Sequence, residues 1–93
     1  MRFMVLHTLE PGVGYDDCEQ YQQLTQSDAQ VKGVRSFINM TEGKAVCIYD
    51  APDEEALAKW LLSVGLAFDV ILQVEAEGDR QELRDMTVSH ARS

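Results

Sequence analysis

The hydrophobic pattern of residues 1–9 predicts a β-strand that is apolar on both faces. Phe3 and Val5 lie on one side of the pleat, and Met4 and Leu6 lie on the other. A strand of this kind needs cover on both sides, so we expect it to be central in its sheet. The turn residues of segment 10–14 end it.

The following segment predicts a helix over residues 16–30. Asp16 and Glu19 have the spacing of a capping pair at its start. The apolar stripe of this helix is thin, and the glutamines and glutamates between its members face water. The stripe consists of Cys18, Tyr21, Leu24, Thr25 and Ala29. Gly33 fits the turn that leads into the second strand.

Two strands are predicted over residues 34–40 and 44–50, on either side of a short loop that contains Gly43. Glycine supplies the positive φ that short hairpin loops need, so we expect these strands to pair antiparallel. A second helix follows. It begins after Asp53, whose carboxylate can accept hydrogen bonds from free backbone N–H groups, and it ends at Gly65, which suits a left-handed cap.

The remaining chain predicts one more strand and a tail. The strand covers residues 70–77 and places Val70 and Leu72 on one face. Residues 79–93 form a charged C-terminal tail with few apolar side chains to bury. A short helix or an extended arm are both compatible with the tail, and we expect its end to fray.

The order strand, helix, strand, strand, helix, strand predicts one ferredoxin-like α+β domain over residues 1–78. Two right-handed crossovers give a four-stranded antiparallel sheet with both helices on one face. The other face then has no cover, although the first and third strands are apolar on both sides. We therefore predict a homodimer that packs sheet against sheet as a dimeric α/β barrel. A monomer whose tail folds over the sheet is the alternative.

Composition and charge limit the binding partners that we expect for this protein and the cellular compartment in which we expect it. The 93 residues suit one domain, and eight Lys and Arg against sixteen Asp and Glu give a formal net charge of −8. An acidic surface repels phosphate backbones and anionic lipids, so we expect neither nucleic acid nor membrane as a partner. No apolar run approaches the roughly 20 residues of a membrane span. With no evident leader and only two cysteines, a cytoplasmic location is expected.

Several stretches carry a resemblance to known proteins. They are residues 33–57, beginning Gly33-Val-Arg-Ser-Phe-Ile-Asn-Met, residues 65–78, beginning Gly65-Leu-Ala-Phe-Asp-Val-Ile-Leu, the opening Met1-Arg-Phe-Met-Val, and Glu10-Pro-Gly. Over roughly residues 1–86 the chain resembles a family of small bacterial proteins of unknown function, some of which are described as nickel-binding. The resemblance implies a ferredoxin-like subunit that forms a dimeric α/β barrel.

The resemblance also bears on metal binding. Many relatives carry a histidine on the second helix at the place of Trp60 and another on the second strand near Phe37, and indole and phenyl rings offer a metal no suitable lone pair. The remaining donors show no metal-motif spacing: they are His7, Cys18, Cys47, His90 and the carboxylates. We therefore assign no metal ligand and no cofactor.

Three residues with reactive side chains have ordinary structural interpretations. His7 can face the helix-covered core, the dimer seam or a pocket, where an imidazole suits proton transfer or hydrogen bonding to a ligand. Cys47 is expected to be a buried, unreactive thiol, because no positive charge is evident beside it. Cys18 lies in the first helical turn, where the helix dipole lowers the pKa of a thiol, but we expect it to serve in packing.

An apolar pocket between helices and sheet is the candidate binding site. Small-molecule sites are mostly apolar, with one or two polar groups. The predicted ligand-binding residues are His7, Phe37, Asn39, Tyr49 and Trp60. Asn39 and Tyr49 would supply polar contacts, and Trp60 otherwise belongs to the core. Phosphate loops and a serine–histidine–acid set are absent from the sequence, so no catalytic residue is assigned.

Three functions are compatible with these features. The leading hypothesis is a non-enzymatic dimeric protein that binds a small apolar or weakly polar ligand. The second is a cofactor-independent enzyme, monooxygenase- or isomerase-like, that acts on an aromatic substrate with His7, Asn39 and Trp60 in its pocket; only fold analogy supports it. The third is binding of nickel or another divalent metal, as in related sequences. A pocket filled by Trp60, Phe37 and Tyr49 would leave only an interaction role.

Overall fold

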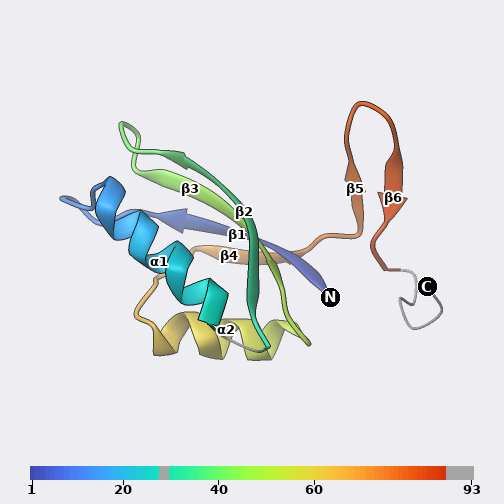
Figure 1. Cartoon of the computed structure of the whole chain (residues 1–93), viewed down its shortest axis with the longest axis horizontal. Helices are drawn as coiled ribbons and strands as arrows, with labels where there is room; N and C mark the ends of the chain where they lie inside the picture. The colour runs from blue at the N-terminus through green and yellow to red at the C-terminus, as the bar shows by residue number, and fades with distance from the viewer. Residues whose placement is uncertain (28–29, 88–93) are drawn as a thin grey trace.

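The computed structural model describes residues 1–27 and 30–87 and has the predicted α+β, ferredoxin-like architecture (Figure 1). The elements are β1 (Arg2–Thr8), α1 (Tyr15–Ser27), β2 (Lys32–Asn39), β3 (Lys44–Asp50), α2 (Glu54–Ser63), β4 (Val70–Gln73), β5 (Ala76–Gly78) and β6 (Leu83–Asp85). The main sheet has the order β2-β3-β1-β4, and all neighbours pair antiparallel. Strand β1 is central, as predicted, and β3, which is also apolar on both faces, is the other central strand.

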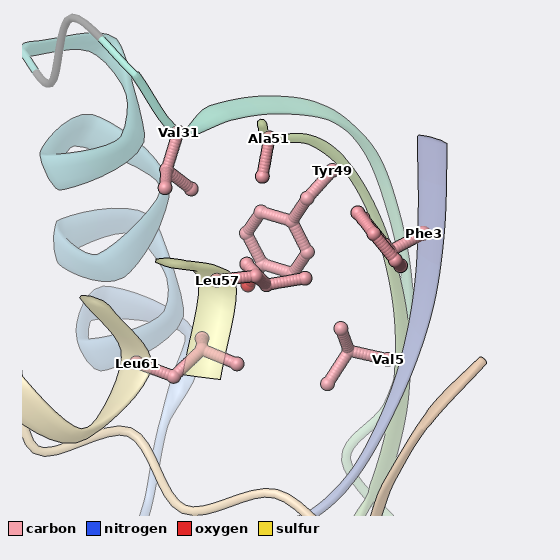
Figure 2. Close-up of a cluster of buried hydrophobic side chains, with 7 residues drawn as sticks. All are labelled: Phe3, Val5, Val31, Tyr49, Ala51, Leu57 and Leu61. Carbon is pink, nitrogen blue, oxygen red and sulfur yellow. The ribbon is translucent and has the colours of Figure 1, made fainter. Parts of the chain in front are cut away.

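The hydrophobic core lies on the helix-covered face of this sheet. Strand register places Phe3 opposite Tyr49, and Leu57 and Leu61 of α2 are fully buried. Figure 2 shows these side chains converging between sheet and helix. The cluster consists of Phe3, Val5, Val31, Tyr49, Ala51, Leu57 and Leu61. Because side chains alternate along a strand, Met4 and Leu6 lie on the opposite face.

The second helix and the hairpin follow their sequence signals. The Oδ1 atom of Asp53 accepts a 2.7 Å hydrogen bond from the Ala56 N–H, which caps α2. Gly65 has φ +75° just after this helix, and Gly43 has φ +68° in the loop between β2 and β3. Both glycines adopt the left-handed backbone that the sequence predicts.

The first helix departs from prediction at its start and on its buried side. It begins at Tyr15, and its capping side chain is Asp17, whose Oδ2 accepts a 2.8 Å hydrogen bond from the Gly14 N–H. The predicted pair of Asp16 and Glu19 does not form this cap. On the predicted apolar stripe Thr25 is buried, whereas Leu24 is exposed. Ala29 lies outside the described residues.

Gly33 has a role other than the predicted turn. It lies within β2, and a Cβ atom there would stand only 2.5 Å from the Thr25 Oγ1 atom of α1. The glycine is therefore required because the helix approaches the strand closely. This approach sets the distance between α1 and the sheet.

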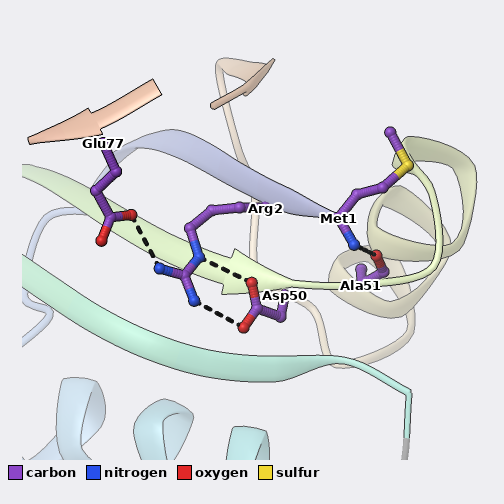
Figure 3. Close-up of polar contacts among 5 residues, drawn as sticks. All are labelled: Met1, Arg2, Asp50, Ala51 and Glu77. Atoms are coloured by element: carbon purple, nitrogen blue, oxygen red, sulfur yellow. Dashed lines mark hydrogen bonds and ion pairs between the residues drawn. The ribbon is translucent and has the colours of Figure 1, made fainter. Parts of the chain in front are cut away.

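The predicted strand 70–77 is interrupted after Gln73. Residues 76–78 leave the sheet and pair with β6 in a separate two-stranded hairpin, which extends away from the domain in Figure 1. Arg2 of β1 connects β3 and this hairpin. Its Nε and Nη2 atoms donate to the two carboxylate oxygens of Asp50 on β3 at 2.8 and 2.9 Å, and its Nη1 atom donates to Glu77 on β5 at 2.9 Å (Figure 3). We call β5 and β6 with their loop the hairpin arm.

The helices in the described ranges are too short, and too polar, to span a bilayer. The part of the predicted tail beyond residue 87, including His90, lies outside the described residues.

Candidate functional site

A cavity of about 190 Å³ lies between α1 and the helix-covered face of the sheet. It exists because the side chains that face one another here are short: Cys18 and Thr25 on the helix, and Ser36, Ala45 and Cys47 on the strands. The residues after α2 close one end. Its walls are mainly apolar and include Leu9, Val13, Val34, Ile38 and Leu66. We call this space the α1–sheet cavity.

His7 supplies an unusual polar group to the α1–sheet cavity. Its side chain is only 2% exposed, and the Nδ1 atom donates a 2.7 Å hydrogen bond to the carbonyl oxygen of Ala67. The Nε2 atom is buried and makes no hydrogen bond to any part of the chain that the structure describes. A buried polar atom without a partner is costly and rare in native proteins. The Nε2 atom is therefore available to a partner that residues 1–27 and 30–87 do not supply.

Cys47 lies beside His7 on the floor of the same cavity. Val5, two residues before His7, is the register partner of Cys47, so the two side chains are diagonal neighbours on one face. The Ser36 hydroxyl donates a 3.3 Å hydrogen bond to the Cys47 Sγ atom. Although Nε2 has no partner with hydrogen-bond geometry, the charged forms of His7 and Cys47 are close enough to stabilise each other.

This proximity changes the protonation of both groups. Burial by itself raises the pKa of Cys47, but interactions with His7, Ser36 and Tyr49 outweigh burial, and the pKa is lowered. Burial by itself lowers the pKa of His7, but Cys47, the Ala67 carbonyl and the charge of Asp69 outweigh burial, and the pKa is raised. Both shifts favour a thiolate–imidazolium pair. The prediction that Cys47 has no positive group beside it is wrong.

Cys18 is the second thiol of the cavity, and its environment is different. Burial raises its pKa, and the negative charges of Asp17 and the Cys47 thiolate raise it further. The expected lowering by the helix dipole is therefore wrong, because the acidic first turn and burial dominate. The two cysteines share one cavity but differ in their readiness to ionise.

The five predicted ligand-binding residues divide between the two faces of the sheet. His7 and Tyr49 line the α1–sheet cavity. Trp60 packs on the core, with its ring centroid 6.1 Å from that of Tyr49. Phe37 and Asn39 lie on the opposite face, because they pair in register with Val46 and Lys44. The expected convergence of Phe37, Asn39 and Trp60 with His7 on one pocket does not occur.

Asn39 instead supports the hairpin: its Oδ1 atom accepts a 2.8 Å hydrogen bond from the Glu42 N–H. Sequence reasoning missed Ser36, Cys18 and Cys47 as cavity residues. Strand register could have identified Cys47 as a neighbour of His7. If β1 and β3 are paired so that their buried positions share one face, His7 lies diagonally opposite Cys47.

The uncovered face of the sheet carries two apolar rows across the strands. Register aligns them as Val70, Leu6, Val46 and Phe37, and as Leu72, Met4 and Ile48, with Arg35 at the end of the second row. Phe37 is 59% exposed and Leu72 is 48% exposed. Polar rows flank the apolar ones at both ends: Thr8, Lys44 and Asn39 at one, and Arg2, Asp50 and Lys32 at the other. We call this surface the open face.

Comparison with known proteins gives the family. A family model described as nickel responsive protein SCO4226-like matches residues 3–74. This chain belongs to the SCO4226-like family. The crystal structure of SCO4226 from Streptomyces coelicolor A3(2) matches with a TM-score of 0.74 and 22% identity, over 84% of this chain and 100% of that chain. At this identity the likeness shows the fold. No curated protein matches. The resemblance to a small bacterial family is thus confirmed.

The family description mentions nickel, which makes the donor set of this chain relevant. Within residues 1–27 and 30–87, no group of three or more His, Cys, Asp or Glu side chains is arranged to hold a metal ion. The pair of His7 and Cys47 offers two donors, fewer than the four of a usual structural site. The described residues therefore do not fit a nickel centre, and no chemistry is routed through one.

Proposed function

We propose that this SCO4226-like protein is a non-enzymatic binding protein whose α1–sheet cavity takes one small, uncharged molecule with a single hydrogen-bonding group. The observation that carries this proposal is the buried, unpartnered Nε2 atom of His7 at the cavity. A ligand that hydrogen-bonds to this atom would remove the cost of leaving it unsatisfied. The hydrogen bond from Nδ1 to Ala67 holds the ring in place for this contact.

The size and walls of the cavity define the ligand class. Engineered apolar cavities of about 150 Å³ bind benzene, so the 190 Å³ found here has room for one six-membered ring. The apolar walls favour a carbon skeleton, and because Glu10 and Arg35 of opposite charge both belong to the lining, the cavity offers no net charge to attract an ion. A cyclic ketone has this combination of features. Its carbonyl oxygen would accept a hydrogen bond from Nε2 in the imidazolium form of His7, in which both ring nitrogens carry a proton.

Titration of the ¹⁵N-labelled protein with cyclohexanone, followed by amide chemical shifts, tests this function. We expect saturable shifts confined to the cavity residues. A pair of variants at one position provides the control: Cys18→Ala leaves the space open and retains the shifts, whereas Cys18→Phe fills it and abolishes them. Absence of saturable shifts, or shifts that Cys18→Phe leaves unchanged, would reject the α1–sheet cavity as the site.

We further propose that the protein is a homodimer that packs the open face against a second copy. The support is the pattern of that face: apolar rows in the centre, exposed at Phe37, Val70 and Leu72 and half-buried between them, and polar rows at both ends, which is the usual anatomy of a protein interface. Monomers rarely expose contiguous apolar patches of this kind. Glu77 of the hairpin arm binds Arg2 in the polar row at one end of the open face. The arm therefore begins beside the surface on which we place the second copy.

Light scattering coupled to size-exclusion chromatography at micromolar concentration tests this assembly. The expected mass is twice the 10.5 kDa of one chain. A strictly monomeric protein would contradict the dimer but would leave the cavity proposal standing, because every lining residue of the α1–sheet cavity comes from one chain.

A further inference from the structure

We propose that Cys47 is a nucleophile that forms a covalent adduct with small, uncharged α,β-unsaturated carbonyl compounds in the α1–sheet cavity, and that His7 accepts the thiol proton and delivers it to the adduct. The inference rests on the proposed binding role of that cavity and adds a reaction to it. Two independent observations carry it: a thiol on the cavity floor, and a buried imidazole nitrogen beside it without a partner in the described chain.

The geometry around the sulfur suits nucleophilic attack. Ser36 donates a 3.3 Å hydrogen bond to the Cys47 Sγ atom, which stabilises negative charge there. His7 is fixed by its 2.7 Å bond to Ala67 and keeps Nε2 available on the same face. A cysteine beside a histidine, with the histidine oriented by a third group, is the general arrangement of an activated thiol.

The charge state of the pair supports this role. Interactions with His7 and Ser36 overcome burial and lower the pKa of Cys47, while the pKa of His7 is raised. The thiolate is the nucleophilic form, so a larger thiolate fraction near neutral pH speeds attack. The other charged or titratable groups around the pair are Tyr49 on β3, Arg35 on β2, Cys18 and Tyr21 on α1, Glu10 before α1, and Asp69 after α2. Cys18 has a raised pKa and is the less reactive thiol.

The reaction is an addition that needs no further reagent. The proton of the Cys47 thiol moves to Nε2 of His7, which leaves a thiolate and an imidazolium. The sulfur lone pair forms a bond to the β-carbon of the unsaturated carbonyl compound, the C=C π bond breaks, and its electrons move to the carbonyl oxygen as an enolate. The C=O bond then re-forms and the α-carbon of the enolate takes the proton from Nε2, which regenerates neutral His7 and leaves a saturated carbonyl adduct on Sγ.

The cavity selects the electrophile. Its apolar walls and single-ring size admit a neutral enone, whereas the acidic protein surface disfavours an anionic electrophile. The matched pair of 2-cyclohexen-1-one and cyclohexanone separates reaction from binding, because the two rings have nearly the same shape and only the first has a C=C bond. Binding of both is expected, with an adduct from the first alone.

Intact-mass spectrometry with peptide mapping, after incubation with 2-cyclohexen-1-one at mildly acidic pH, tests the proposal. We expect one adduct, at Cys47, forming at least about tenfold faster than at Cys18, since thiolate fraction sets the rate. Cys47→Ala should form no fast adduct, and Leu62→Ala, at an exposed position of α2 that does not line the cavity, should react like the native chain. Reaction at Cys18 first, or no adduct on the native protein, overturns the proposal.

The role of His7 needs a readout that a purely structural residue would not change. In His7→Asn the amide can still donate to Ala67, but Nε2 is missing. We expect adduct formation about tenfold slower near neutral pH, with the rate rising only toward the alkaline range of an ordinary thiol. An unchanged pH profile overturns the role of His7. Ser36→Ala gives a second test at an exposed strand position, with the same direction of change.

The two proposals fail in different ways. Binding of cyclohexanone without any enone adduct at Cys47 rejects the nucleophile and leaves the binding function. An adduct at Cys47 without saturable cyclohexanone binding rejects the reversible binding function and leaves the reactive thiol.

Discussion

The Nδ1 atom of His7 donates a 2.7 Å hydrogen bond to the carbonyl oxygen of Ala67, which ties the end of β1 to the loop after α2. The bond fixes Nδ1 as the nitrogen that donates to the backbone, and it leaves Nε2 for another partner. It also closes one end of the α1–sheet cavity, since residues 65–67 form part of its lining. Stability and binding are therefore coupled through one side chain.

Replacing His7 tests this coupling. His7→Ala leaves the Ala67 carbonyl without its donor and enlarges the cavity, so we expect a loss of about 1–3 kcal/mol in the free energy of unfolding. His7→Asn retains an N–H donor and should recover most of the loss. Urea denaturation of the two variants measures the difference. Equal stability of His7→Ala and the native protein would show that the hydrogen bond is not structural.

Gly33→Ala tests the close approach of α1 to β2. The new Cβ would stand 2.5 Å from Thr25 Oγ1, so strand or helix must shift, and we expect a cost of about 1–3 kcal/mol. Thr25→Ala removes the two outer atoms of that side chain. Thermal unfolding of the single and double variants should show that the double variant loses less than the sum of the single losses. Strict additivity would contradict a steric contact between these positions.

Arg2→Met tests the ion pairs that join β1, β3 and the hairpin arm. The hydrogen bond from Arg2 lowers the pKa of Asp50 against the opposing effect of burial. The folded carboxyl thus has a lower pKa than the unfolded one. Its contribution to stability is present above the unfolded pKa of about 4 and is lost as pH falls through the lower folded value.

We expect Arg2→Met to cost about 0.5–1.5 kcal/mol at neutral pH, because water partly screens this half-exposed pair. The cost should shrink as pH falls below about 4, where Asp50 becomes protonated. Lys59→Met removes a largely solvent-exposed pair with Glu55 and should change stability little at any pH. Urea denaturation across pH makes the comparison, and a pH-independent cost for Arg2→Met would contradict the assigned role of Asp50.

Phe37→Asp tests the open face as a dimer interface. Phe37 is 59% exposed in the isolated chain and ends one apolar row, so a buried charge there should dissociate the dimer. Leu62 on α2 is 70% exposed and lies away from the open face, which makes Leu62→Asp the matched control. Light scattering should report a monomer for the first variant and a dimer for the second. The same mass for both would exclude Phe37 from the interface.

Local chemistry explains which parts of the fold can be predicted from the sequence. Asp53, Gly43 and Gly65 act within a few residues of their own position, and the structure confirms all three. The two-faced apolar pattern of β1 and β3 likewise predicts their central positions. The end of β4 at Gln73 was not predictable in this way, because residues 74–77 continue the alternation while the Arg2 contact to Glu77 and pairing with β6 draw the chain out of the sheet.

The site was harder to predict because it depends on register and on distance between layers. A one-residue change in the register of β2 moves the side chains of Phe37 and Asn39 from one face of the sheet to the other. The hydrophobic pattern of β2 does not determine which of the two faces they occupy. The requirement for Gly33 comes from Thr25 in another element, so a turn was the natural interpretation. The residues next to Cys47 in the sequence are uncharged, and only the pairing of β3 with β1 brings His7 beside it.

The central claim is that His7 presents a free Nε2 atom to a ligand in the α1–sheet cavity. Long-range ¹H–¹⁵N correlation spectra of the imidazole, recorded in a His90→Gln background so that one histidine remains, observe both ring nitrogens during titration with cyclohexanone. We predict a saturable shift of the Nε2 resonance, with Nδ1 held nearly constant by Ala67. An Nε2 resonance that stays unchanged up to saturating ligand would contradict the account.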